Sequence, residues 1–168
     1  MNPIVGVPLL LILATCQAVV AQLLAPVTDL RPHLVLLAVI AIGLLGGMRS
    51  GAIWGAVGGL ALDLASAGPF GGMTLCLALA GLLSGLGQTE ALRFNRLLPL
   101  EAAFAGTLVV DLLYMLLLLL GGWDFNWIVA IYEVVLPSSL INLLAMPAIY
   151  GLCYWLRRRL RPRSEIAW

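Results

Sequence analysis

The chain is poor in charged residues and contains no lysine. Only 10% of its 168 residues are charged, whereas 62% are hydrophobic and the mean hydropathy is +1.08. A soluble domain usually carries about 25% charged residues, so this composition excludes one. Repeated apolar stretches of roughly 18 or more residues are typical of helices that cross a membrane. The composition therefore predicts an all-α polytopic membrane protein.

Residues suited to catalysis or metal binding are also scarce. Cys16, Cys76 and Cys153 are scattered through apolar stretches without metal-ligand spacing, so we interpret them as small packing residues. We place the single histidine, His33, at a membrane interface, and it has no matching cluster of metal ligands. The chain also lacks a nucleophile elbow, a phosphate-binding glycine loop with its lysine, and paired carboxylates at convincing spacing. We expect no enzymatic activity, no metal and no cofactor.

Breaks rich in proline, glycine and charge divide the chain into six candidate transmembrane helices. They cover residues 4–25, 33–48, 50–66, 71–88, 97–120 and 128–156. The first stretch lacks the basic residues that begin a secretory signal peptide, so we expect it to be retained. The second and third are short, and a five-span alternative treats one of them as shallow or re-entrant. The six helices would form one transmembrane domain, residues 1–156, followed by a tail, residues 157–168.

The arginines favour six spans over five. With six spans and a cytoplasmic N-terminus, only Arg31 falls outside, and the other eight of the nine basic residues fall on the cytoplasmic side. This asymmetry is what the positive-inside rule requires. Five spans would move one group of arginines across the membrane. We therefore predict a multi-pass protein with both termini in the cytoplasm.

Most of these arginines form a basic tail directly after the last apolar stretch. They are Arg157, Arg158, Arg159, Arg161 and Arg163. A basic run in this position anchors the topology and touches anionic membrane lipid. A second possibility is that it docks a cytoplasmic protein. We expect no nucleic acid as a partner.

Four glycines at a spacing of four residues run along the third predicted helix. They are Gly47, Gly51, Gly55 and Gly59. Because no water-driven force brings helices together in lipid, close packing depends on small side chains that let the backbones touch. The glycines therefore predict a helix–helix interface. The sequence leaves open whether this interface is internal or docks the transmembrane helix of a partner.

Several polar residues interrupt the apolar stretches, where they are costly and seldom accidental. We expect Asp63, Glu133, Gln17 and Gln22 in the outer halves of their helices, and Asp111 near the middle of its helix. Together they predict a polar cavity or partner-binding network that opens towards the outside. One alternative is a purely structural network of hydrogen-bonded carboxyl groups. Another is a role in transport or ion coupling.

Four short motifs resemble those of a known family. They are Arg31-Pro32, Asp63-Leu64-Ala65-Ser66, Val110-Asp111-Leu112 and Ser138-Ser139-Leu140-Ile141-Asn142. By their order and spacing the chain resembles the bacterial rod shape-determining protein MreD family along nearly its whole length. His33 departs from the family pattern, because relatives often carry an acid or an amide after Arg-Pro.

The resemblance implies a non-enzymatic membrane scaffold or regulatory subunit of the cell-wall elongation (Rod) complex, located in the bacterial inner (cytoplasmic) membrane. It implies MreC as a partner. Further contacts with MreB, a RodA-type polymerase and a class B penicillin-binding protein are possible, and the implied role is in peptidoglycan synthesis and cell shape. The family fold is similar to that of the S components of energy-coupling-factor transporters. A substrate-binding S component of a small-solute (vitamin-type) transporter is therefore the alternative function. A proton-coupled carrier usually needs internal repeats, and we find none in the chain.

Overall fold

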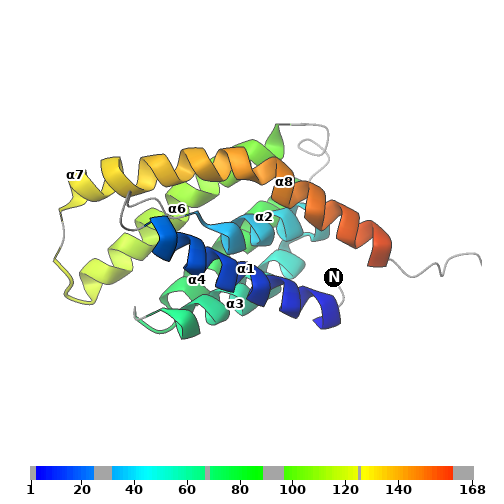
Figure 1. Cartoon of the computed structure of the whole chain (residues 1–168), viewed down its shortest axis with the longest axis horizontal. Coiled ribbons are helices and arrows are strands. Elements are labelled where there is room, and N and C mark those ends of the chain that lie inside the picture. The colour runs from blue at the N-terminus through cyan, green and yellow to red at the C-terminus, as the bar shows by residue number, and fades with distance from the viewer. Residues whose placement is uncertain (1–2, 25–31, 67–68, 89–96, 125, 161–168) are drawn as a thin grey trace, which may run out of the picture.

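The computed structural model describes residues 3–24, 32–66, 69–88, 97–124 and 126–160, and these ranges contain helices and no strand (Figure 1). The helices begin with α1 (Pro3–Leu24), α2 (Leu34–Gly46), α3 (Met48–Ala65), α4 (Gly72–Ser84) and the 3-10 turn η1 (Gly85–Gln88). They continue with α6 (Leu98–Leu120), α7 (Trp127–Ala130), the π-helical turn η2 (Ile131–Val135) and α8 (Leu136–Leu160). The segments α7, η2 and α8 follow one another without a break and form the last long helix.

The six predicted helices are present, but only three of those described are long and apolar enough to cross a membrane. The three segments are Gly6–Leu23, Leu98–Leu120 and Trp127–Arg159. The apolar helices α2 and α4 have 13 residues each, which extend only about 20 Å. That length is shorter than the hydrocarbon core of a bilayer, about 30 Å. The prediction of six transmembrane helices is thus confirmed for the helix count and for three of the spans.

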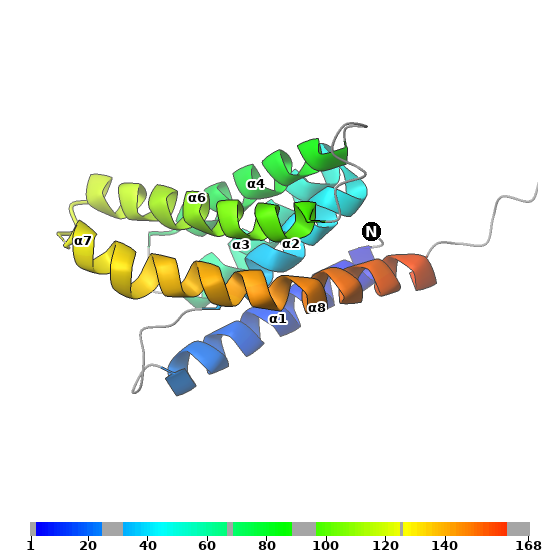
Figure 2. The same ribbon diagram turned by 90° about the horizontal axis from the view of Figure 1, so that it is seen from above.

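The short helix α2 lies at the centre of the bundle. It packs against each of α1, α3, α4, α6 and α8, and it is enclosed by them in Figures 1 and 2. Its residues 35–43 are all buried and, apart from Gly43, apolar. A helix that is apolar on every side is expected where protein surrounds it. Because protein covers α2, it need not match the thickness of the lipid.

The helix α3 packs most extensively against α4. Its glycines Gly51, Gly55 and Gly59 face the α4 backbone, so that a Cβ atom added at any of them would collide with that backbone. The glycine face of α3 is therefore covered by α4 within the chain. Gly47 does not belong to this face, because it forms the turn between α2 and α3 with φ of 86°. Glycine adopts this left-handed conformation without the steric penalty of a side chain.

The helix α1 lies at the edge of the bundle and packs on α2 and α3. Near its start, the ring of Trp54 from α3 lies so close to Gly6 that no Cβ atom would fit there. Figure 2 shows that α1 then diverges from α8 towards its C-terminal end.

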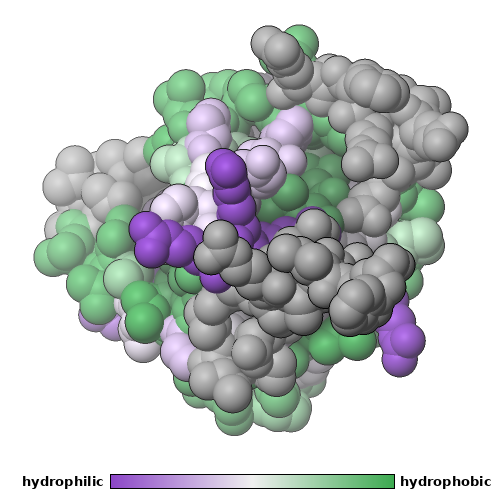
Figure 3. Space-filling model, turned by 90° about the vertical axis from the view of Figure 1, so that its right-hand side faces the viewer, coloured by the Kyte–Doolittle hydropathy of each residue, from purple (hydrophilic) through white to green (hydrophobic). Residues whose placement is uncertain are grey.

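The last helix extends beyond the predicted end of the transmembrane domain. It continues through Leu160, so Arg157, Arg158 and Arg159 occupy its last turn rather than a tail. Basic residues stabilise a helix C-terminus through its dipole, and no proline or glycine interrupts this segment. Figure 3 shows the end of the molecule where α8 finishes, and hydrophilic residues gather near the middle of that face. Arg161 and Arg163 lie outside the described residues.

Candidate functional site

A cavity of about 660 Å³ lies at the end of the bundle opposite the arginines of α8. It is formed where α1 and α3 end, beside the C-terminal half of α6 and the start of the last helix. Its walls are mostly apolar, and the carboxylate, imidazole and amide side chains that line it are Gln17, Gln22, His33, Asp111 and Asp124. A cleft of this size with apolar walls and a few polar groups has the properties of a ligand-binding pocket.

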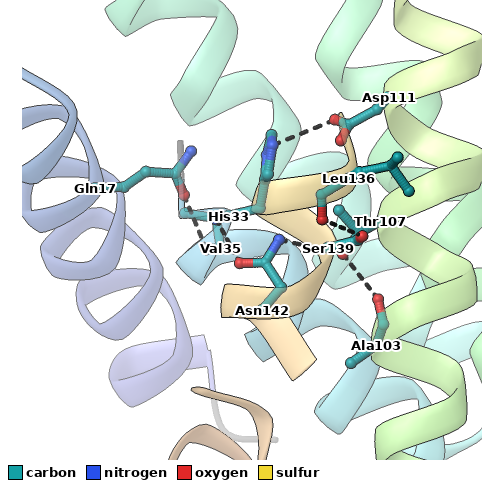
Figure 4. Close-up of polar contacts among 9 residues, drawn as sticks. All are labelled: Gln17, His33, Val35, Ala103, Thr107, Asp111, Leu136, Ser139 and Asn142. Carbon is teal, nitrogen blue, oxygen red and sulfur yellow. Dashed lines mark hydrogen bonds and ion pairs between the residues drawn. The ribbon is translucent and has the colours of Figure 1, made fainter. Parts of the chain in front are cut away.

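A nearly buried histidine–carboxylate pair lines the cavity, and Figure 4 shows its two side chains, His33 and Asp111, pointing towards each other. The Nε2 atom of His33 lies 3.2 Å from Oδ1 of Asp111, and the two side chains are only 10% and 11% exposed. His33 immediately precedes α2, whereas Asp111 belongs to α6. The pair therefore joins the start of the central helix to the wall of the cavity.

Two amide side chains from other helices cap the start of α2 (Figure 4). The first N–H groups of a helix have no partner within the helix. Here the backbone N–H of His33 donates to Oδ1 of Asn142 at 3.0 Å, and that of Val35 donates to Oε1 of Gln17 at 3.1 Å. Because Asn142 lies on α8 and Gln17 on α1, the start of α2 is held from both sides of the bundle.

The hydrogen bonds continue from Asn142 into α6. Its Nδ2 donates to Oγ1 of Thr107 at 3.2 Å, and the hydroxyl of Thr107 donates to the carbonyl of Ala103 at 2.8 Å. Thr107, Ser138, Ser139 and Asn142 have no exposed surface. A buried polar network whose members are satisfied specifies one arrangement of the helices that contribute to it. This network fixes α2, α6 and α8 relative to one another.

Asp63, near the end of α3, caps the N-terminus of α4 with its side chain. Its carboxylate accepts hydrogen bonds from the backbone N–H groups of Gly71, Met73 and Thr74, each at 3.0 Å, and from the Thr74 hydroxyl at 2.6 Å. The side chain is buried, with 5% of the residue exposed. A negative charge at a helix N-terminus is stabilised by the unpaired N–H groups and by the helix dipole. Asp63 thus fixes the connection between α3 and α4.

The structure separates the polar residues that the sequence grouped together. Gln17, Gln22 and Asp111 line the cavity, whereas Asp63 and Glu133 are not among its lining residues. Glu133 is exposed on η2. The five residues therefore occupy three different places: the cavity, the α4 cap and the outer surface of the last helix.

His33 and Thr107 are members of the site that the sequence reasoning missed. The sequence reasoning placed His33 at a membrane interface and gave it no part in the site, whereas the residue is 8% exposed and lies inside the bundle. Its position directly before a short, wholly apolar helix was the available signal. Thr107 precedes Asp111 by four residues, a spacing that puts both side chains on one face of a helix.

The described ranges contain no group of three or more His, Cys, Asp or Glu residues that could hold a metal ion. What the site offers is an apolar chamber with hydrogen-bonding groups at its inner end. Fold and site together define a polytopic, all-helical membrane protein with a cavity at one end.

The family of the chain follows from its sequence as a whole. The model of the family described as rod shape-determining protein MreD matches residues 1–160. The chain belongs to the MreD family, and it is a membrane protein with a role in rod shape determination. No curated protein and no solved structure matches it.

Proposed function

We propose that this chain is a non-enzymatic scaffold or regulatory subunit of the cell-wall elongation (Rod) complex in the bacterial inner membrane. It binds MreC and helps to position or activate peptidoglycan synthesis, so that cell shape is maintained. A RodA-type polymerase, a class B penicillin-binding protein and MreB are its further partners. The observation that carries this proposal is the match to the MreD family over residues 1–160.

The proposed orientation places both termini in the cytoplasm. It is supported by the basic last turn of α8, with Arg157, Arg158 and Arg159, because basic residues mark the cytoplasmic ends of spans. The guanidinium carbon of Arg159 lies 5.1 Å from the centroid of the Trp155 ring, and both side chains suit the headgroup region. In this orientation the cavity opens towards the outside.

The surface proposed to bind MreC is the outer face of the last helix around Glu133. Beside this acid runs a row of exposed apolar residues with a spacing of four. They are Ile128, Tyr132, Leu136, Leu140 and Leu144. The Glu133 side chain makes no hydrogen bond or ion pair with any other described residue. It lies six residues into the last helix, roughly 9 Å from its start. A carboxylate facing lipid at that depth is costly, so a partner that covers it would stabilise the protein.

The π-helical turn that carries Glu133 also supports this surface. The turn η2 spans Ile131–Val135 and directly precedes Leu136-Pro137. Single π-helical turns inside α-helices occur frequently at functional sites. Here the turn rotates the side chains before Pro137 relative to those after it, and so decides where Glu133 points.

The decisive experiment is affinity purification of the tagged chain from its native membranes in mild detergent, with quantification of co-purified MreC. We expect Glu133→Leu to reduce MreC recovery at least about tenfold, because a hydrogen bond to a charged group contributes about 1.5–3 kcal/mol. The yield and thermal stability of the variant itself should be unchanged or higher, since an acid has been removed from lipid.

Glu101→Leu, which removes an exposed carboxylate from α6, is the matched control. Full recovery of MreC with Glu133→Leu would exclude this surface, and absence of MreC from the unaltered chain would exclude the function.

A small-solute S component is the second candidate function, and the cavity of about 660 Å³ favours it. The same purification separates the two functions. Recovery of an ATP-binding-cassette pair with a transmembrane coupling subunit, in place of MreC, would make this chain a solute-binding protein.

A further inference from the structure

The hairpin formed by α3 and α4 ends before the rest of the bundle does. Figures 1 and 2 show that α6 and the last helix extend beyond α3 at the cavity end. The 18 residues of α3 extend roughly 27 Å, less than the hydrocarbon core of about 30 Å, and any tilt shortens their reach. With the exposed Arg49 at the start of α3 among the headgroups, the other end of α3 does not reach the opposite headgroups.

The connection between α3 and α4 is apolar, whereas the connection between α6 and α7 is polar. The first reads ASAGPFGG (65–72) and the second GGWDFN (121–126). Phe70 is 70% exposed, and Ser66, the polar residue of its connection, lines the cavity. In the second connection, Asp124 and Asn126 are exposed. Since an exposed phenylalanine suits hydrocarbon and an exposed carboxylate suits water, the two connections belong at different depths.

The start of α4 is independent of water. Backbone polar groups within lipid must find partners inside the protein, because no solvent is there to pair with them. The N–H groups of residues 71–75 all do so. The carboxylate of Asp63 accepts three of them, and the carbonyls of Pro69 and Gly71 accept the other two. This end of the hairpin therefore meets the condition for lying in lipid.

The outer face of α4 suits acyl chains rather than a partner helix. The exposed residues between Gly72 and Gly87 are all leucines, namely Leu75, Leu79, Leu83 and Leu86. Helix pairing in lipid relies on small side chains or on side chains that form hydrogen bonds. The glycines of α3 already serve that purpose inside the chain, against the α4 backbone. Lipid is thus the occupant that this leucine face fits.

We propose that the α3–α4 hairpin ends inside the membrane at the cavity end, where phospholipid covers it. The acyl chains of that leaflet contact Phe70 and Leu64, both of which are exposed, and the headgroups lie above them. The connection between α6 and α7 reaches the headgroup layer instead. This inference concerns the hairpin alone and does not depend on the proposed scaffold function.

The test compares the two connections in the full chain, in phosphatidylcholine nanodiscs that leave both bilayer faces open to reagents. Phe70→Cys and Trp123→Cys are made in a chain whose exposed Cys16 is replaced by alanine, since Cys76 and Cys153 are buried. Trp123, which is 58% exposed, provides the matched position. We expect a charged, membrane-impermeant maleimide to react at least about tenfold more slowly with Phe70→Cys, because charge is costly in hydrocarbon. Equal rates in nanodiscs would overturn the proposal.

A nitroxide on the same two cysteines distinguishes cover by lipid from cover by protein. At Phe70→Cys, oxygen, which concentrates in hydrocarbon, should relax the label more than a water-soluble nickel chelate does. The order should be reversed at Trp123→Cys. A Phe70→Cys label that neither reagent reaches would mean that protein covers it, and one reached mainly by nickel would mean that water does. Either result would overturn the proposal. If Phe70→Cys fails to fold, Leu64→Cys in the last turn of α3 allows the same comparison.

Discussion

The α3–α4 contact and the cavity end of the molecule pack helices in opposite ways. Between α3 and α4 the backbones touch, and Gly51, Gly55 and Gly59 leave no room for a Cβ atom. At the cavity end, α1, α6 and η2 surround a space of about 660 Å³. The start of α2 is held there by hydrogen bonds that its backbone N–H groups donate to Gln17 and Asn142. The first region is held by contact along its whole length, whereas the second depends on a few polar side chains. Substitutions should therefore damage the two regions to very different degrees.

The largest effect is expected where the backbones touch. A Cβ atom at Gly55 would lie 2.7 Å from the carbonyl carbon of Leu77 and 2.9 Å from Cα of Ala78, so Gly55→Leu must separate α3 from α4. We expect a loss of at least about 3 kcal/mol of stability and no monodisperse protein in size-exclusion chromatography. Gly151→Leu is the control, because a Cβ atom at Gly151 meets nothing within 4 Å. Equal behaviour of the two variants would show that the α3–α4 contact tolerates separation.

The next effect concerns the end of the α3–α4 region. Asp63→Ala removes the acceptor of four hydrogen bonds at the start of α4, and we expect a loss of about 2–3 kcal/mol. Asp63→Asn keeps one acceptor oxygen without the charge and should lose about half as much. The thermal unfolding midpoint of the chain in detergent measures both variants. An Asp63→Asn variant as unstable as Asp63→Ala would mean that the charge, and not the geometry of the cap, stabilises α4.

The sequence predicted the two regions unequally well. The helix count and the family membership were confirmed. Both can be predicted because apolar runs and short motifs consist of residues that are neighbours in the sequence. The glycine spacing is likewise local, and it lies on the α3 face that touches α4. Only Gly47 departs from that face, because it lies in the turn between α2 and α3 and not on α3 itself.

The contacts at the cavity end could not be predicted because they join distant parts of the chain. Asn142 and His33 are 109 residues apart, and no local periodicity relates them. Burial of His33 also depends on α1, α6 and α8, which all contribute side chains around the start of α2. The carboxyl groups of Asp63 and Asp111 looked alike in the sequence, both being acids in apolar runs. Only the fold distinguishes a helix cap from a partner of histidine.

A moderate effect is expected at the inner end of the cavity. We expect the single variants His33→Ala and Asp111→Ala each to lose stability. The double variant should lose less than the sum of the two single losses, by about 1 kcal/mol or more, because groups in contact couple by about 0.5–3 kcal/mol. Thermal unfolding of the four chains gives this coupling. The control cycle combines His33→Ala with Gln22→Ala, which alters another lining residue and should be additive within about 0.5 kcal/mol. Additivity in both cycles would mean that the His33–Asp111 pair contributes nothing to the stability of the cavity end.

The smallest effect should come from the hydrogen bond between Gln17 of α1 and the start of α2. Gln17→Ala removes the acceptor for the backbone N–H of Val35, and we expect a loss of about 1 kcal/mol with faster hydrogen exchange at that amide. Gln22→Ala is the matched control, because Gln22 is exposed and lines the same cavity five residues further along α1. If Gln17→Ala exchanges no faster than Gln22→Ala, α1 is held by its apolar contacts, such as that of Gly6 with Trp54. Faster exchange confined to Gln17→Ala would instead show that this hydrogen bond holds the start of α2 against α1, in contrast to the continuous backbone contact of α3 with α4.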